Sequence, residues 1–155
     1  MKLQQLLGDY SLVTKISVRD VLTSFEFYSN KLGFNYEPQF TFNSDGKFGD
    51  GSWIQLSITN VDQSSSICLF SDPEHAGSET EIFTIDVQDI TLAKQSLEDE
   101  GIIVGNIDKT DTEDGNTIYF AFFYDPDGNG IGIRQNEFSS PEEYKEIPKR
   151  CATIF

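Results

Sequence analysis

The chain has 155 residues, of which 37% are apolar and 13% aromatic, and its formal net charge is −15. This composition is typical of a folded domain with a hydrophobic core and argues against a disordered chain. The negative charge argues against nucleic acid and anionic membrane as partners, because both would repel the protein.

The same charge either only keeps the protein soluble or also attracts a cationic ligand. The first ten residues, MKLQQLLGDY, are too short and polar for a secretory signal, and no stretch approaches the roughly 20 apolar residues of a membrane span. The two cysteines, Cys68 and Cys151, form neither a CxxC motif nor a disulfide framework. We therefore expect a cytoplasmic protein with a single domain over residues 1–155.

Hydrophobic periodicity in the first half predicts a strand over 10–18, a helix, and three further strands at 34–42, 52–58 and 65–71. Asp20 is expected to cap the helix and Gly33 to end it. The apolar stripe of this helix has spacings of four, three and four residues, and consists of Val21, Phe25, Tyr28 and Leu32.

The second half repeats this order. A strand is predicted over 81–87, followed by Asp89 as a helix cap, a helix that ends near Gly101, and strands at 102–107, 116–124 and 130–135. The helical stripe comprises Ile90, Ala93 and Leu97. In the tail, SPEEYKE has the composition of a short helix with Ser140 as its cap.

The two halves share the pattern hydrophobic-x-Val-x-Asp-hydrophobic, then a helix, a glycine and a new strand. The offset is 69 residues between Asp20 and Asp89, and 68 between Gly33 and Gly101. This periodicity indicates an internal duplication of a βαβββ unit. We predict an α+β fold with module 1 over about 10–71, module 2 over about 81–135, and a C-terminal tail over 136–155.

Three stretches resemble the vicinal oxygen chelate superfamily of glyoxalases, bleomycin-resistance proteins and extradiol dioxygenases. They are VRDVLTSFEFYSNKLGF, IFTIDVQDI and FYDPDGNGIGI, at 18–34, 82–90 and 123–133. The resemblance implies two tandem βαβββ modules that form a curved mixed sheet lining a cup, with the helices outside. It also implies a homodimer, and whether each cup forms within one chain or across the dimer stays open.

In metal-dependent relatives four strands carry the ligands, and the resemblance maps these positions onto Val13, Cys68, Ile82 and Gly132, with Ser66 as the alternative to Cys68. A catalytic zinc needs about three protein ligands, and hard cations need oxygen donors. Valine, isoleucine and glycine side chains offer neither. We therefore expect no metal and no cofactor. The single histidine, His75, lies in the loop DPEHAG, where it is either a surface residue or part of a relocated site.

Strand alternation predicts the side chains that face the cup. We expect an aromatic-lined cavity for an organic ligand, in which the candidate ligand-binding residues are Lys15, Trp53, Gln55, Asp86, Phe120, Phe122, Tyr124 and Arg134. Two other roles stay open: the aromatic residues could belong to the core or a dimer interface, and Arg134 could simply pair with Asp86.

The leading functional hypothesis is a metal-free small-molecule-binding protein of the bleomycin-resistance type. The alternative is a lyase or dioxygenase of the glyoxalase class with a non-standard metal site, and a lesser one is a metal-free enzyme that uses Asp86 or Tyr124 as acid or base. No Ser-His-Asp arrangement, P-loop or dinucleotide fingerprint is present. We expect Cys68 to be a small buried residue of its strand, because a reactive thiol needs positive charge nearby. Catalytic residues and the identity of the ligand are not predicted.

Overall fold

The computed structural model describes residues 1–8, 12–44, 46–58, 65–77 and 81–137. It contains two four-stranded mixed sheets with the same strand order, β1-β4-β3-β2 in the first and β5-β8-β7-β6 in the second. In each sheet the first strand pairs in parallel with the fourth, and the remaining pairings are antiparallel. The repeated order confirms the predicted α+β fold of two tandem βαβββ modules.

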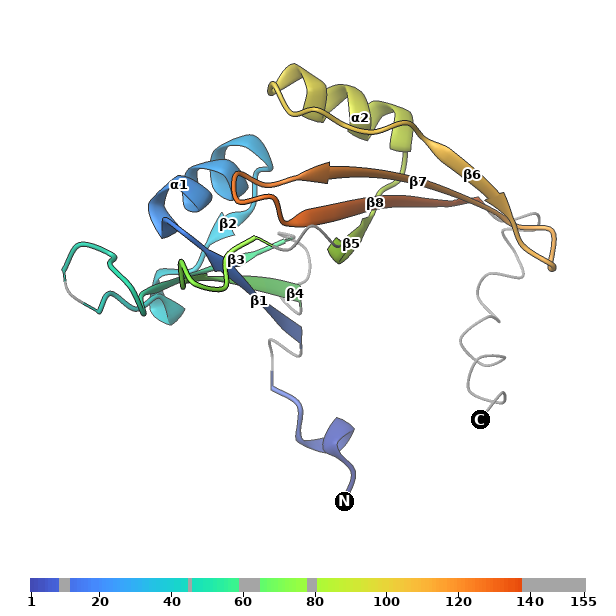
Figure 1. Cartoon of the computed structure of the whole chain (residues 1–155). Helices are drawn as coiled ribbons and strands as arrows, with labels where there is room; N and C mark the ends of the chain where they lie inside the picture. Colours follow the sequence, from blue (N-terminus) through green and yellow to red (C-terminus); the bar gives the residue numbers. More distant parts are fainter. Residues whose placement is uncertain (9–11, 45, 59–64, 78–80, 138–155) are drawn as a thin grey trace.

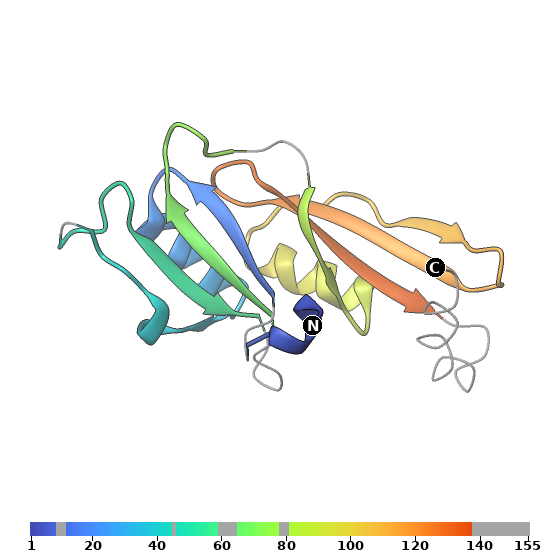
Figure 2. The same cartoon turned by 90° about the horizontal axis from the view of Figure 1, so that it is seen from below.

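Module 1 follows a short 3₁₀ turn, η1 (Leu3–Leu6), and contains β1 (Leu12–Val18), α1 (Val21–Phe25), its π-helical continuation η2 (Glu26–Lys31), β2 (Asn35–Tyr36), η3 (Pro38–Phe40), β3 (Trp53–Ser57) and β4 (Ser65–Ser71). Module 2 contains β5 (Glu81–Asp86), α2 (Ile90–Asp99), β6 (Asp108–Asp111), β7 (Thr117–Tyr124) and β8 (Gly130–Glu137). Figure 1 shows both helices on the same side of the sheets, and Figure 2 shows the sheets side by side with the helices behind them.

Two predicted strands differ from the structure. The stretch 34–42 contains the two-residue β2, the 3₁₀ turn η3 and an isolated bridge from Phe42 to Trp53, because Pro38 cannot donate to a ladder. The stretch 102–107 belongs to no strand, and its Gly105 N–H donates to the Phe122 carbonyl at 2.8 Å. The strand that does pair with β7 is β6, which follows at 108–111. The helix predicted in the tail lies outside the described residues.

The hydrophobic core lies between the sheets and the helices, as the alternation predicted. Ile54 and Leu56 of β3 are buried, as are Ala121 and Phe123 of β7. Both predicted helical stripes pack inward: Val21, Tyr28 and Ile90 are buried, and Phe25, Leu32, Ala93 and Leu97 pack against the buried cluster. The opposite side of each sheet, which we call its open face, therefore carries the other set of side chains.

The turn between β7 and β8 connects the two modules. Its Asp125 accepts a hydrogen bond from the buried Tyr28 hydroxyl at 2.8 Å. Asp127 pairs with Arg19 at 3.0 Å, and the Asn129 side-chain amide donates to the Ser17 carbonyl at 3.3 Å. The polar residues of the sequence DPDGNG thus hold the β7–β8 turn against module 1. Within the described residues no helix is long and apolar enough to span a membrane.

Candidate functional site

The open face of the second sheet gathers five of the predicted ligand-binding residues. The register aligns Phe122 with Gly132 and Phe120 with Arg134 across β7 and β8, and Arg134 with Asp86 across β8 and β5. The rings of Phe120 and Phe122 lie parallel, with their centroids 6.4 Å apart and 2° between their planes. Tyr124 continues the same row and is exposed. The result is a flat aromatic surface next to a polar one.

Arg134 is paired on this face. Its Nε donates to Asp86 Oδ1 at 2.7 Å and its Nη2 to Asp86 Oδ2 at 3.2 Å. The hydrogen bonds to Asp86 raise the pKa of the Arg134 guanidinium above its ordinary value. The guanidinium fork is therefore occupied by a carboxylate of the chain itself, which leaves it less suited to grip an anionic ligand.

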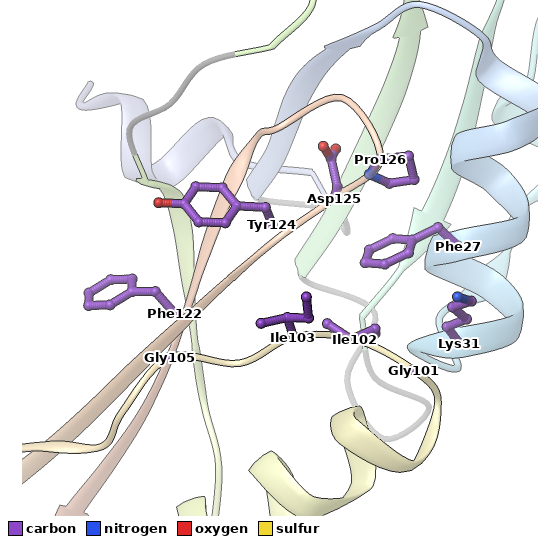
Figure 3. Close-up of a pocket in the computed structure, with 10 residues that line it drawn as sticks. All are labelled: Phe27, Lys31, Gly101, Ile102, Ile103, Gly105, Phe122, Tyr124, Asp125 and Pro126. Atoms are coloured by element: carbon purple, nitrogen blue, oxygen red, sulfur yellow. The ribbon is translucent and has the colours of Figure 1, made fainter.

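A hollow of about 650 Å³ lies where this aromatic row meets module 1. Phe122 and Tyr124 line one side of it, and Figure 3 shows Phe27 and Lys31 of η2 across from them, with Ile102 and Ile103 between. Ile103 is 90% exposed. The remaining lining residues are Gly101, Gly105, Asp125 and Pro126. A hollow of this size suits a small organic molecule.

The other three predicted ligand-binding residues lie on the open face of the first sheet. Lys15 places its ammonium 4.2 Å from the centroid of the Phe70 ring. Gln55 is opposite Cys68 in the register. Trp53 packs on Phe42 with ring centroids 4.6 Å apart, and its Nε1 donates to the Phe40 carbonyl at 2.8 Å. None of these three lines the hollow described above, which draws only on Phe122 and Tyr124 among the predicted residues.

The positions mapped from metal-binding relatives do not form a metal centre. Val13 is exposed, Cys68 is half-buried, and Gly132 has no side chain. Burial raises the pKa of the Cys68 thiol, and nearby Lys15 only partly opposes this, so the thiol stays protonated at neutral pH. His75 lies on the surface, where its Nδ1 is 2.9 Å from Asp72 Oδ2. Among the described residues no three His, Cys, Asp or Glu side chains come together as a metal-binding group.

The fourth mapped position, Ile82, does not follow the expected alternation. The ladder between β5 and β8 pairs Glu81 with Gly130 and then Phe83 with Ile131, so Ile82 is an extra residue in a β-bulge. Its side chain packs against the core, and the Glu81 carboxylate lies over Gly132 on the open face instead. The expectation that Ile82 faces the cup is therefore wrong, and the sequence contains no turn residue that signals the bulge.

Sequence reasoning also missed the residues that module 1 and the segment after α2 contribute to the hollow. Phe27 lies outside the stripe that runs through Tyr28, and the expected strand at 102–107 concealed the role of Ile102 and Ile103 as lining residues. Gly105, whose N–H donates to the Phe122 carbonyl at 2.8 Å, was the available signal, because a glycine within a strand-like run can mark a close backbone approach.

Comparison with known protein families and solved structures shows what this chain is similar to. The model for the glyoxalase/bleomycin resistance protein/dioxygenase superfamily matches residues 11–133. A search of curated proteins finds no match. Among solved structures, the chain is similar to TnmS3, an antibiotic binding protein from Streptomyces sp. CB03234, with 24% identity, a TM-score of 0.58, and coverage of 79% of this chain and 92% of that one.

Two further solved structures are similarly related. A member of the same superfamily from Sphaerobacter thermophilus DSM 20745 has 20% identity and a TM-score of 0.60, and the match covers 79% of this chain and 94% of that one. A glyoxalase family protein from Bacillus anthracis has 18% identity and a TM-score of 0.60, with 81% of this chain and 93% of that one covered. At these identities the structural similarity establishes the fold alone.

Proposed function

Because the chain belongs to the glyoxalase/bleomycin resistance protein/dioxygenase superfamily, we propose that it binds a small organic molecule without a metal ion. The observation that carries this proposal is the parallel pair Phe120 and Phe122, which continues through Tyr124 into a hollow of about 650 Å³. Aromatic faces of this kind bind flat, apolar ligands through burial and stacking. The similar fold of TnmS3, described as an antibiotic binding protein, supports an antibiotic-like ligand class.

The chemistry of the open faces favours binding over metal-dependent catalysis. The residues at the mapped ligand positions supply one protonated thiol and no imidazole or carboxylate. Within the described part of the chain, the Glu81 carboxylate on the open face of module 2 belongs to no group of three metal-binding side chains. A lyase or dioxygenase of the glyoxalase class would need a donor set that the described residues do not form. Elemental analysis of protein purified without chelator tests this, and one equivalent of a tightly bound transition metal would reverse the ranking.

Calorimetric titration with planar aromatic compounds, including aromatic antibiotics, tests the binding function directly. A compound that binds should bind about fivefold more weakly to Phe122→Ala, because ring area that the ligand covers is lost. Leu92→Ala is the matched control, since Leu92 is an exposed apolar side chain on α2, on the helix side of the sheet. Equal losses in the two variants, or no binder at all, would contradict the proposed site.

We also propose that the protein is a homodimer. Strand β1 is at the edge of its sheet, and Leu12 and Val13 at its start are 62% and 42% exposed. An edge strand with exposed apolar side chains is a ready surface for another chain. Sedimentation equilibrium should give twice the mass of one chain, and a monomer at micromolar concentration would contradict the proposal.

A further inference from the structure

The bulge in β5 brings a carboxylate to the centre of the open face in module 2. Because Ile82 is the extra residue, Glu81 and Thr84 both lie on the side of the sheet where Gly132 lacks a side chain. The Thr84 hydroxyl donates a hydrogen bond to Glu81 Oε1, and this is the carboxylate's hydrogen bond within the described part of the chain.

Gly132 provides the space that the carboxylate occupies. A Cβ atom at position 132 would lie 2.6 Å from Glu81 Oε1, 3.1 Å from Glu81 Cδ and 3.0 Å from Thr84 Oγ1. Any side chain at this position would therefore displace Glu81. The glycine is better explained by the acid beside it than by flexibility, since its backbone is in an ordinary strand conformation.

The carboxylate has no cation partner among the described residues. The nearest cation on this face in the register is Arg134, and its guanidinium is held by both oxygens of Asp86. No described ion pair includes Glu81. An ionised carboxylate has about four acceptor positions, and Thr84 uses one of them.

The register places this acceptor at a fixed separation from the aromatic row. Gly132 of the central strand β8 pairs with Thr84 on one side and with Phe122 on the other. Adjacent strands are about 4.8 Å apart, so the Thr84 and Phe122 backbones are about 10 Å apart. A ligand whose aromatic ring packs on Phe122 could place a hydrogen-bond donor, attached to the ring through a short alkyl chain, at the Glu81 carboxylate.

We propose that Glu81 is a specificity-determining residue that binds a protonated amine, while the aromatic part of the same ligand packs on Phe122. The inference rests on the proposed small-molecule-binding function and names the chemical class of its ligand. The substrate class is an aryl-alkylammonium compound. Gly132 is required because it leaves the carboxylate in place, and Thr84 orients it.

Three probes that share a 1-naphthylmethyl group test this: 1-naphthylmethylammonium, 1-naphthylmethanol and the anion of 1-naphthaleneacetic acid, which are cationic, neutral and anionic at pH 7. Calorimetry at about 0.15 M salt limits the contribution of the overall negative charge. The ammonium compound should bind wild-type protein about tenfold more tightly than the alcohol, and the acetate should bind most weakly. Glu81→Gln should bring the ammonium and alcohol affinities to within about twofold.

Two further variants test whether the preference for the ammonium compound comes from Glu81 or from the overall negative charge of the protein. Glu100→Gln removes the same charge at the exposed end of α2 and should keep the tenfold preference. Gly132→Ala should also reduce ammonium binding, because the new Cβ would lie 2.6 Å from Glu81 Oε1 and shift the carboxylate, which keeps its charge. Thermal melting of Glu81→Gln near the wild-type temperature shows that its loss of preference does not come from unfolding.

Equal affinity of wild-type protein for the ammonium compound and the alcohol would overturn the inference and leave the binding function standing. A tenfold preference that survives in Glu81→Gln, or that Glu100→Gln also abolishes, would overturn it as well. Failure of all three probes to bind, together with the absence of any binder among planar aromatic compounds, would remove the proposed function itself.

Discussion

At the scale of single residues, the contact between Tyr28 and Asp125 explains why the turn after β7 carries an aspartate. The carboxylate accepts from the Tyr28 hydroxyl at 2.8 Å, from the backbone N–H groups of Asp127 and Asn129 at 2.9 Å each, and from the Asn129 side chain at 2.9 Å. Both Tyr28 and Asp125 are buried. A buried charge is tolerated when its acceptor positions are filled in this way.

The same contact predicts how stability changes at high pH. Burial raises the pKa of the Tyr28 phenol far above its ordinary value, and the charge of Asp125 raises it further. A raised pKa in the folded state means that the stabilisation is complete below the unfolded value of about 10 and is lost as the pH rises beyond it. Urea unfolding should therefore show stability falling above about pH 10.

The variant Tyr28→Phe provides the control for that prediction. It removes the titrating phenol together with one hydrogen bond, and should cost about 1–2 kcal/mol at pH 7. Its stability should fall less steeply than that of the wild type above about pH 10, because the other tyrosines remain. Parallel curves for the two proteins would show that Tyr28 does not cause the alkaline loss.

At the scale of elements, the duplicated aspartates are caps, as the sequence predicted. Asp20 accepts from the Leu22 and Thr23 N–H groups at 3.0 and 3.3 Å, and Asp89 from Leu92 N–H at 3.0 Å. These bonds satisfy amides at the helix N-terminus that have no partner within the helix. The repeated motif is thus a repeated folding signal, which does not by itself indicate chemistry.

Asp20→Ala and Asp89→Ala should each lower the free energy of unfolding by about 1 kcal/mol, as loss of an N-cap does. Chemical denaturation measures both, and Glu113→Ala, which removes an exposed acid from the turn before β7, should change it by less than about 0.5 kcal/mol. A neutral result for Asp20→Ala would contradict its capping role.

Strands that bury one face could be predicted from the sequence, and the strand that buries neither face could not. The alternating apolar pattern predicted β3, β4, β7 and β8 to within about two residues. Strand β6, Asp108–Asp111, is exposed at every position, and it is held to β7 by main-chain pairing and by a hydrogen bond from the Thr117 hydroxyl to the Asp111 carboxylate at 2.8 Å, so no hydrophobic signal marks it. The apolar run at 102–107 was the stronger signal. Its Ile102 and Val104 are buried in the core, but the run forms no strand of the second sheet.

The candidate site was predictable in part for the same reason. Alternation placed Phe120, Phe122 and Tyr124 on one face correctly, because Ala121 and Phe123 between them are buried. It failed at Ile82, since a single inserted residue reverses the side on which every preceding side chain lies. The hollow itself needs contributions from η2 and from the segment after α2, whose position depends on tertiary packing.

At the scale of the whole molecule, the joint between the modules depends on close backbone approach. Gly77 precedes module 2 with φ of +87°, and a Cβ atom there would lie 2.6 Å from the Asp127 carbonyl oxygen and 3.3 Å from Arg19 Nη2. Gly128 has a similar φ of +86° but open space around it. The two glycines thus separate the cost of backbone conformation from the cost of crowding at the joint.

Both Gly77→Ala and Gly128→Ala should lose about 1–2 kcal/mol of stability through the left-handed backbone. Gly77→Ala should lose more and should also weaken the contact of Asp127 with Arg19, because Asp127 must move. Thermal melting of the two variants provides the comparison, and a smaller loss in Gly77→Ala than in Gly128→Ala would show that the approach is not tight.

The bond between Tyr28 and Asp125 joins residues 97 positions apart, and this has a consequence during synthesis on the ribosome. At about 5–20 residues per second, the acceptor for the Tyr28 hydroxyl emerges roughly 5–20 s after the tyrosine does. A nascent chain that holds only the first module therefore has no Asp125 carboxylate to accept the hydrogen bond of the Tyr28 hydroxyl. Completion of the last hairpin is the event that closes the first half of the protein.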